Sequence, residues 1–149
     1  AEADHEEETN FFPTFEALKP RILVADDNRV NRKVADAMLV KLGCEVTLAS
    51  SGKQAISILE SSPFDLILMD CHMPEMDGFD ASRIIRSWST ETDEIKRSAS
   101  TTPIVALTAD VLPGIRERCL DAKMNGMISK PFRQEELAKE IARWIGNRQ

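Results

Sequence analysis

The chain has 149 residues, which is enough for one ordinary domain with its core and too few for two. A composition that is 42% hydrophobic, a formal net charge of -6 and a pI of about 5.0 indicate a globular protein, without the basic surface that attracts nucleic acid or an anionic membrane. No apolar run approaches the roughly 20 residues of a membrane span, and no signal peptide opens the chain. Cys44, Cys71 and Cys119 are odd in number and widely spaced, which predicts reduced thiols and a cytoplasmic protein.

Residues 1–19 begin with an acidic stretch that has no apolar periodicity. Such a stretch cannot bury enough apolar surface to fold alone, so we expect residues 1–19 to be a flexible acidic linker and residues 20–149 to form the domain. The alternative is that aromatic residues of this segment, such as Phe15, dock on the domain surface.

From Arg21 onward, short β-rich runs alternate with helical patterns. This alternation is typical of repeated βαβ units and therefore of an α/β fold with a parallel sheet. The predicted strands are Arg21–Ala25, Glu45–Ala49, Asp65–Met69, Pro103–Thr108 and Met127–Ser129.

Apolar residues recur at helical spacing in five segments between and after these strands, which predicts five helices with their apolar faces in the core. Asn28 or Asp27 can cap the first helix, and Gly43 ends it. The polar segment between Trp88 and Pro103 is longer than a usual connection, so we expect a flexible surface loop there. The five apolar stripes are Val30, Val34, Met38 and Leu42; Ala55, Ile58 and Leu59; Ala81, Ile84, Ile85 and Trp88; Leu112, Ile115, Cys119 and Ala122; and Leu137, Ile141, Trp144 and Ile145.

Three acids follow predicted strands directly: Asp26 and Asp27 after the first, and Asp70 after the third. Parallel strands deliver the residues at their carboxyl ends to one crevice, where ligands bind. Adjacent carboxylates repel one another unless a cation lies among them, so the cluster predicts a divalent metal with oxygen ligands, for which Mg²⁺ is well suited. Taken singly, Asp26 and Asp27 could instead cap a helix, and Asp70 could be a turn residue.

Two further strand ends add groups of the opposite kind, because Thr108 closes the fourth strand and Lys130 follows the fifth. Carboxylate, metal, hydroxyl and ammonium together are what phosphoryl transfer onto an aspartate requires. Asp70 is the best candidate nucleophile because it alone terminates a central apolar strand. A lone Thr at a strand end is usually structural and a Lys before Pro is usually a solvated charge, so the prediction depends on all five residues meeting.

Four motifs resemble those of the receiver domain of two-component response regulators: Asp-Asp after the first strand, Met-Asp-Cys-His-Met-Pro-Glu-Met-Asp-Gly around the third, Leu-Thr-Ala after the fourth and Ser-Lys-Pro-Phe after the fifth. The resemblance covers Arg21 to about Gly146. It implies a doubly wound, flavodoxin-like, three-layer fold whose five-stranded parallel sheet has the order 2-1-3-4-5.

The resemblance also assigns roles. Asp70 would accept a phosphoryl group from a phosphohistidine, and Mg²⁺, or Mn²⁺ in its place, would be bound by Asp26, Asp27, Asp70 and the backbone carbonyl of His72. Thr108 would be the switch hydroxyl and Lys130 its ion-pairing partner. The Lys130–Pro131 bond would be cis, as it generally is in receivers. His72 and Asp110 would flank the route of an attacking water and tune dephosphorylation.

Two positions depart from the pattern of the family. Met127 stands where many receivers carry the Tyr or Phe whose ring moves inward with the switch hydroxyl, so we expect no aromatic-rotamer switch. Lys123 stands where related sequences often have Gly, which predicts a positive φ at a cost near ~1 kcal/mol.

The run from Arg116 to Phe132, the acidic start and the absence of an initiator methionine or a following DNA-binding domain resemble the carboxyl-terminal receiver of a hybrid sensor histidine kinase. Plant ethylene-receptor-like and bacterial hybrids are alternatives. The implied partners are a phosphohistidine-bearing kinase domain and a histidine phosphotransfer protein, which would dock near the first helix and the Lys130 loop. The surface of the last two helices would report the signal, and the domain alone would be a monomer that contacts neither nucleic acid nor membrane.

Two other functions are compatible with these residues. The first is an enzyme, a phosphatase or phosphotransferase that forms an aspartyl phosphate and uses His72 as a general acid. The second is a binding module of the same fold that has lost phosphorylation, which the presence of every acceptor-site residue disfavours. As a receiver, the domain would phosphorylate itself from a donor, and the parent chain would be the histidine protein kinase.

Overall fold

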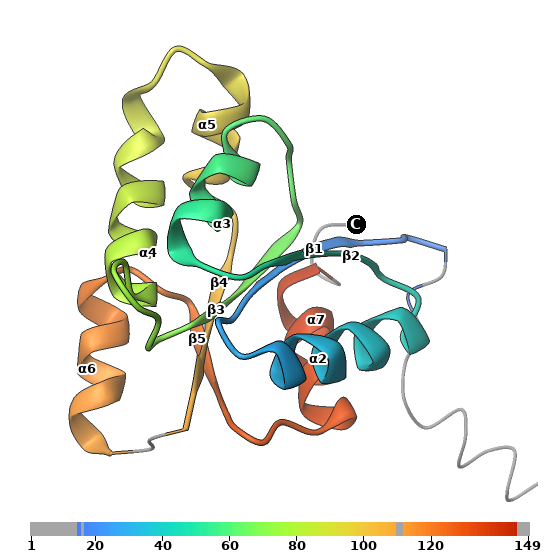
Figure 1. The fold of residues 1–149 in the computed structure, drawn as a ribbon. Helices are drawn as coiled ribbons and strands as arrows, with labels where there is room; N and C mark the ends of the chain where they lie inside the picture. The colour runs from blue at the N-terminus through green and yellow to red at the C-terminus, as the bar shows by residue number, and fades with distance from the viewer. Residues whose placement is uncertain (1–14, 16, 110–111, 146–149) are drawn as a thin grey trace, which may run out of the picture.

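A computed structural model describes residues 15, 17–109 and 112–145. Five strands form one parallel sheet in the order β2-β1-β3-β4-β5 (Figure 1). This order confirms the doubly wound α/β fold that the sequence predicts. The strands are β1 (Arg21–Ala25), β2 (Glu45–Ala49), β3 (Leu66–Asp70), β4 (Ile104–Thr108) and β5 (Gly126–Ser129).

Helices cover both faces of the sheet. Helices α2 and α7 lie on one face, and α3, α4 and α6 lie on the other (Figure 1). The helices are α2 (Arg29–Lys41), α3 (Gly52–Leu59), α4 (Gly78–Ser87), α5 (Glu94–Ala99), α6 (Pro113–Asp121) and α7 (Gln134–Ile145), with a short 3-10 helix η1 (Trp88–Thr90) after α4.

The alternation of side chains along each strand divides the core into two layers. In β1, Ile22 and Val24 join the layer under α2 and α7, while Leu23 and Ala25 join the layer under α3, α4 and α6. Strands buried on both faces are continuously apolar, as β3 and β4 are. The sheet is therefore anchored from both sides, and the ends of its central strands are where a ligand can reach it.

The predicted strands agree with the structure to within one residue at each end. The main correction is β3, which runs Leu66–Asp70 and not Asp65–Met69. The Asp65 carboxylate instead accepts a hydrogen bond from the Arg21 backbone N–H at 2.8 Å, just before the strand begins. Asp70 therefore belongs to the sheet itself, so its backbone is held by the neighbouring strands.

The apolar stripe predicted for α2 is wrong at Val30 and Val34, whereas Leu42 is buried and Met38 packs against the core, as predicted. Val30 and Val34 are exposed, and the helix packs on the sheet through Ala35 and Leu39, followed by Leu42. Both faces of this helix carry apolar residues, so periodicity alone could not choose between them. The small Ala35 side chain permits close approach to the sheet, and the valines are left on the surface beside Asp27.

Two smaller predictions about helices had different outcomes. Asn28 is confirmed as the cap of α2, since its side chain accepts a hydrogen bond from the Asn31 N–H at 3.0 Å. Leu112, predicted to be core, is 65% exposed. It is the residue that precedes α6, whose buried positions are Ile115 and Cys119.

The predicted flexible loop after Trp88 is wrong, because it contains η1 and α5. Asp93 caps α5 by accepting hydrogen bonds from the N–H groups of Ile95 and Lys96, at 2.9 and 3.2 Å. The Lys96 ammonium lies 5.5 Å from the centroid of the Trp88 ring, and Ala99 is buried. This segment is highly polar, so its helix depends on a cap and on tertiary contacts that apolar periodicity does not register.

Phe15 is docked on the domain, as the alternative interpretation of the N-terminal segment has it. Its side chain is buried in the layer under α2 and α7, and its N–H donates to the Leu42 carbonyl at 2.8 Å. In the rest of the linker predicted over residues 1–19, the N–H groups of Leu18 and Lys19 donate to the Phe15 carbonyl at 3.1 and 2.7 Å. Residues 1–14 and 16 lie outside the described residues.

Gly78 and Gly114 form a matched pair for testing how closely α4 approaches β3. A Cβ at Gly78 would collide with the backbone carbonyl of Asp70, whereas a Cβ at Gly114 would meet nothing within 4 Å. We expect Gly78→Ala to lower the free energy of unfolding by about 1–3 kcal/mol through overpacking. Gly114→Ala should raise it by about 0.4–1 kcal/mol, because it restricts the unfolded chain. Urea unfolding measures both, and equal stability of the two variants would contradict the close approach.

Candidate functional site

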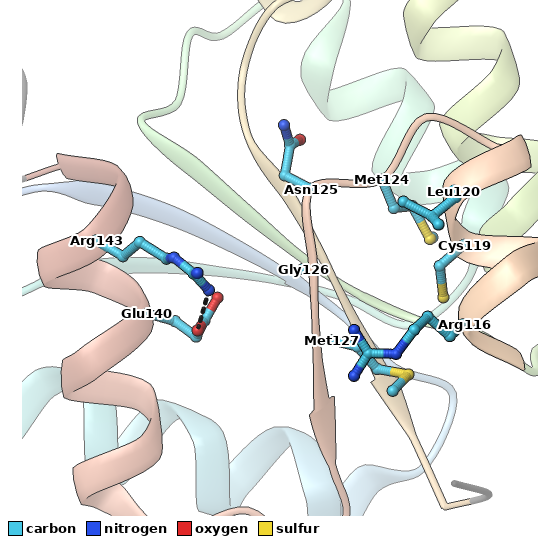
Figure 2. Close-up of a pocket in the computed structure, with 9 residues that line it drawn as sticks. All are labelled: Arg116, Cys119, Leu120, Met124, Asn125, Gly126, Met127, Glu140 and Arg143. Atoms are coloured by element: carbon cyan, nitrogen blue, oxygen red, sulfur yellow. Dashed lines mark ion pairs between the residues drawn. The ribbon is translucent and has the colours of Figure 1, made fainter. Parts of the chain in front are cut away.

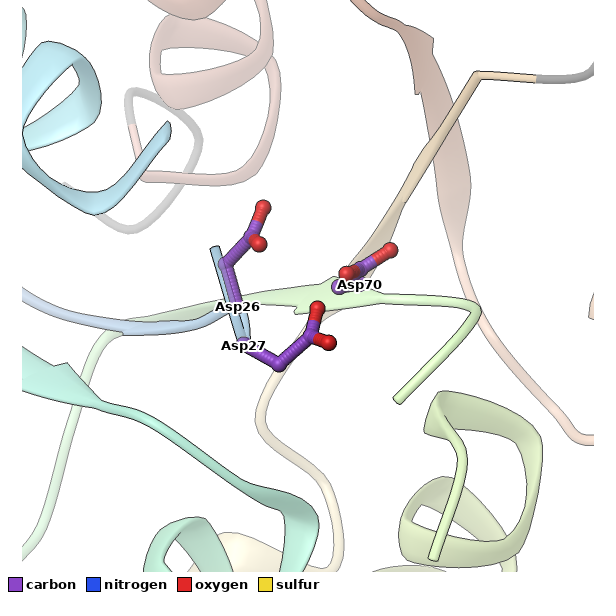
Figure 3. Close-up of side chains that lie close together, drawn as sticks. All are labelled: Asp26, Asp27 and Asp70. Atoms are coloured by element: carbon purple, nitrogen blue, oxygen red, sulfur yellow. The ribbon is translucent and has the colours of Figure 1, made fainter. Parts of the chain in front are cut away.

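The three predicted acids come together at the carboxyl edge of the sheet. Asp26 and Asp27 follow β1, and Asp70 is the last residue of the adjacent β3, whose Met69 is in register with Ala25. One carboxylate oxygen from each residue lies within 4.8 Å of the others (Figure 3). Asp26 and Asp70 are buried and Asp27 is exposed, so the cluster has a closed side and an open side.

Backbone groups orient the two buried carboxylates. Asp26 Oδ1 accepts a hydrogen bond from the Asn28 N–H at 2.8 Å, and Asp70 Oδ1 accepts one from the His72 N–H at 3.2 Å. The Arg32 guanidinium also donates to the Asp26 carbonyl at 2.8 Å. Each acid is therefore held by the turn that follows its own strand.

Lys130 lies between the buried acids. Its Nζ is 3.0 Å from Asp26 Oδ2 and 3.1 Å from Asp70 Oδ1, and its side chain is 15% exposed. Burial works against the ammonium, but hydrogen bonds and charge attraction from both acids outweigh it and raise the pKa of Lys130. The Lys130–Pro131 peptide is cis, as predicted.

Thr108 ends β4 beside this cluster and is fully buried. Strands β3 and β4 are in register at Asp70 and Leu107, which places Thr108 one residue further toward the carboxyl edge than Asp70. Its carbonyl accepts a hydrogen bond from the Lys130 N–H at 2.7 Å. The hydroxyl-bearing and ammonium-bearing residues are thus joined to each other through their backbones.

The single positive charge of Lys130 does not balance the negative charge of three carboxylates. Burial, and then the charge of Asp26, raise the pKa of Asp70 to about 6, although Lys130 and the His72 N–H oppose the rise. Apart from the ion pair with Lys130, Asp26 Oδ2 is buried without a well-oriented hydrogen bond. An excess of hard oxygen donors with an incompletely satisfied buried atom fits a divalent cation such as Mg²⁺.

The remaining residues that the sequence analysis names lie outside the acidic cluster or outside the described residues. His72 is exposed, and its ring packs edge-on against Phe79 with centroids 6.4 Å apart. Asp110 lies outside the described residues. Lys123 has a φ of 61°, so the predicted positive φ is confirmed. Sequence reasoning did not find Arg86, which donates hydrogen bonds to the backbone before β4 and before β5.

Met127 is half-buried on β5 and lines a cavity of about 250 Å³. Figure 2 shows Arg116 of α6 and Arg143 of α7 on opposite sides of β5 there. Glu140 is paired with Arg143 at 3.7 Å and accepts a hydrogen bond from the Trp144 indole at 3.1 Å. A flexible thioether thus occupies the position at which many receivers carry a ring.

The three cysteines are buried and unbridged, which agrees with the prediction of free thiols. Burial raises the pKa of Cys44 to about 11 and that of Cys71 to about 12. The thiol next to Asp70 is therefore protonated at neutral pH and is not a competing nucleophile.

Comparisons with known proteins agree with this geometry. The sequence model of the response regulator receiver domain matches residues 22–142, and the chain belongs to that family. Probable histidine kinase 3 of rice is 46% identical over 141 residues, which are 87% of this chain and 14% of that protein. The chain thus corresponds to a small part of the curated relatives that it matches.

Two solved structures extend the comparison. The receiver domain of the sensor histidine kinase PA1611 from Pseudomonas aeruginosa, with magnesium in its active-site cleft, is 46% identical, with a TM-score of 0.74 over 85% of this chain and 98% of that one. The receiver domain of yeast Ssk1, crystallised with the histidine phosphotransfer protein Ypd1, is 27% identical, with a TM-score of 0.76 over 89% of this chain and 90% of that one. Within the described residues, no helix is both long and apolar enough to cross a membrane.

The raised pKa of Asp70 predicts how stability depends on pH in a chelating buffer. Between about pH 4 and pH 6 the folded chain keeps a proton on Asp70 that the unfolded chain has lost, so this residue's contribution to stability falls as pH rises. The loss should approach about 3 kcal/mol and be complete above pH 6. Asp70→Asn lacks this titration.

The measurement is urea unfolding of the wild type and of Asp70→Asn at several pH values. The variant should gain stability relative to the wild type between pH 4 and pH 6, and the difference should then level off. A difference that stays constant across this range would show that Asp70 does not titrate there.

Proposed function

We propose that this domain accepts a phosphoryl group on Asp70 from a phosphohistidine and passes it on or changes its surface in response. The observation that carries the proposal is the position of Lys130, within 3.1 Å of Asp70 and 3.0 Å of Asp26, between the two buried acids of the cluster. A structural ion pair needs one carboxylate, whereas phosphoryl transfer needs a nucleophile with positive charge around it.

In the reaction, a carboxylate oxygen of Asp70 attacks phosphorus and forms a new P–O bond. The P–N bond to the donor histidine breaks, and its electron pair stays with the imidazole, which leaves as a neutral base once protonated. Lys130 neutralises an equatorial phosphoryl oxygen, and the Thr108 hydroxyl donates to another. Because the His72 N–H already binds Asp70 Oδ1, the other oxygen of this carboxylate is the candidate nucleophile.

Asp26, Asp27, Asp70 and the backbone carbonyl of His72 would hold the metal. Mg²⁺, or Mn²⁺ in its place, supplies positive charge for the phosphoryl oxygens when bound. Because Asp27 is exposed, the phosphoryl group would approach the cluster from the side of Asp27.

The partner surface proposed here is the exposed part of α2 together with the Lys130 loop. Val30 is 67% exposed and Val34 is 40% exposed, on a helix that begins two residues after Asp27, and Pro131 is exposed beside Lys130. Apolar side chains that flank a charged cleft suit an interface in which a helical, histidine-bearing partner lies over the acids. The same arrangement explains why these valines are not used in the core.

The whole protein is proposed to be a hybrid histidine kinase, of which this domain is the receiver, acting in the cytoplasm. The support is the 46% identity to a rice protein named as a probable histidine kinase and to the receiver of the Pseudomonas sensor kinase.

Phosphate incorporation tests the nucleophile. With acetyl phosphate and Mg²⁺, the wild type should take up about one hydroxylamine-sensitive phosphate per chain, and Asp70→Asn should take up none, because the amide cannot form an acyl phosphate. Asp80→Asn is the matched control, since Asp80 is an exposed acid of α4 whose side chain contacts Arg83. Incorporation into Asp70→Asn at the wild-type level would reject the assignment, and labelling should disappear when a chelator replaces Mg²⁺.

Substitution of α2 valines tests the docking surface. Val30→Arg should slow phosphoryl transfer from phosphorylated Ypd1 by roughly tenfold or more, because it puts a charge in the apolar part of the interface. Labelling by acetyl phosphate should be unchanged, since a small donor needs no docking. Val40→Arg is the matched control, because Val40 is 57% exposed at the other end of the helix. If both variants accept phosphate from Ypd1 like the wild type, docking does not use this part of α2.

A further inference from the structure

Arg86 is a half-buried arginine in the last turn of α4, with neutral oxygens as its partners. One terminal nitrogen donates to the carbonyls of Ser100 and Thr102, at 3.0 and 2.8 Å. Nε donates to the Lys123 carbonyl at 3.0 Å, and the other terminal nitrogen donates to Asn125 Oδ1 at 2.7 Å. Among the described residues no carboxylate is in an ion pair with Arg86, so the side chain is a connector of backbone segments and not half of a salt bridge.

The segments that Arg86 connects are those that lead into β4 and β5. Ser100 and Thr102 precede β4, while Lys123 and Asn125 precede β5. Asn125 strengthens the link, because its N–H donates to the Ile104 carbonyl at 2.7 Å and its Oδ1 accepts from the Ile104 N–H at 2.9 Å. The first residue of β4 is thus fastened to the residue immediately before β5.

Fastening two parallel strands at their starts determines where their ends lie. β4 and β5 pair in register from Val105 with Gly126 to Thr108 with Ser129. The ladder finishes with the hydrogen bond from the Lys130 N–H to the Thr108 carbonyl at 2.7 Å. A slip of one residue would turn every side chain of β5 to the opposite face, and a slip of two would move Lys130 by about 6.6 Å along the sheet.

The start of β5 has little else to hold it in register. This strand has four residues, lies at the edge of the sheet and begins with Gly126, which has no side chain to pack. Of its four residues only Ile128 is fully buried. A second contact from α4, in which the Ser82 hydroxyl donates to the Ala122 carbonyl at 2.7 Å, holds the turn that carries Lys123 at positive φ. The hydrogen bonds from α4 therefore hold the start of β5 in register, which the few buried side chains of this short edge strand do not do.

We infer that Arg86 is a positioning residue that sets the register of β5 against β4, and through it the placement of Lys130 and Thr108 relative to Asp70. The consequence for phosphoryl transfer rests on the function proposed above, whereas the consequence for register does not. Asp26, Asp27 and Asp70 are carried by β1 and β3, which Arg86 does not contact in any of these hydrogen bonds. Loss of Arg86 should therefore affect the cation and the hydroxyl while leaving the acids in place.

The test compares Mg²⁺ affinity with labelling rate in the 149-residue chain. Arg86→Gln should lower the rate of labelling by acetyl phosphate at saturating Mg²⁺ by roughly tenfold or more, as expected for an ångström-scale misplacement. Its Kd for Mg²⁺, measured by calorimetry, should not rise above the wild-type value, because the acids are unmoved and a displaced ammonium competes less with the ion. Arg83→Gln, one turn earlier on the exposed face of α4, should leave both quantities unchanged.

Two more variants test whether the effect on labelling comes from the hydrogen bonds of Arg86, from its positive charge or from a general loss of stability. Arg86→Lys keeps the charge but not the planar fork, so its labelling rate should remain low; a wild-type rate would overturn the inference. Ile141→Val lowers stability by about 0.5–1.5 kcal/mol from the far layer of the core, and its labelling rate should be that of the wild type. An equal loss of rate in Ile141→Val would overturn the inference, because general destabilisation would then explain the effect.

Backbone amide NMR reports the register of β5 against β4 without a phosphoryl-transfer reaction. In Arg86→Gln the Thr108 and Lys130 amide signals should shift, and those of Leu23 and Val24, in the middle of β1 and away from Lys130, should not. If Arg86→Gln does not fold, Asn125→Ala, which changes an exposed residue of the same network, should give the same pattern. Unshifted Thr108 and Lys130 signals in the folded variant would overturn the register inference. Failure to label the wild type would instead reject the proposed function.

Discussion

The Lys130 ammonium between Asp26 and Asp70 is the interaction on which the site depends. Asp26 is 1% exposed and Asp70 is 4% exposed, and the Lys130 ammonium is the cation that lies between their carboxylates. Burying carboxylates without a paired cation is costly. Lys130 offsets only part of the effect of burial and of the Asp26 charge, since the pKa of Asp70 remains raised to about 6. The residual excess of negative charge is what makes the site suitable for a divalent ion and, with the ion, for a phosphoryl group.

The parallel sheet explains how residues so far apart in sequence reach one place. β1 and β3 carry the acids, and β4 and β5 carry Thr108 and Lys130, all at the carboxyl edge. Because both faces of the sheet are covered by helices, this edge is where polar side chains can gather without a loss of core packing. The site is thus a consequence of strand direction and register. A change of register would change the distances between the site residues.

The register of β5 against β4 is maintained at the amino-terminal ends of these strands, opposite the carboxyl edge that carries the site. There Arg86 and Asn125 tie the starts of β4 and β5 together, and Lys123 adopts the φ of 61° that lets its carbonyl join them. Near the acids, Gly78 allows α4 to begin directly against the Asp70 backbone. Helix α4 therefore contacts both ends of the sheet, which gives it a part in placing the residues of the acidic site although it contributes none of them.

Sequence alone determined the strand order through the family resemblance, and it determined the five site residues, because apolar runs that end in polar residues are a local signal. The cis Lys130–Pro131 bond and the positive φ of Lys123 were predictable from the family resemblance. Only the tertiary structure decided which face of α2 packs on the sheet, since both faces are apolar, and that Asp93 to Ala99 form a capped helix against Trp88. It also decided the role of Arg86, whose partners are backbone carbonyls and an amide oxygen: every residue type offers a carbonyl, so no pattern of side chains along the chain can reveal such a contact.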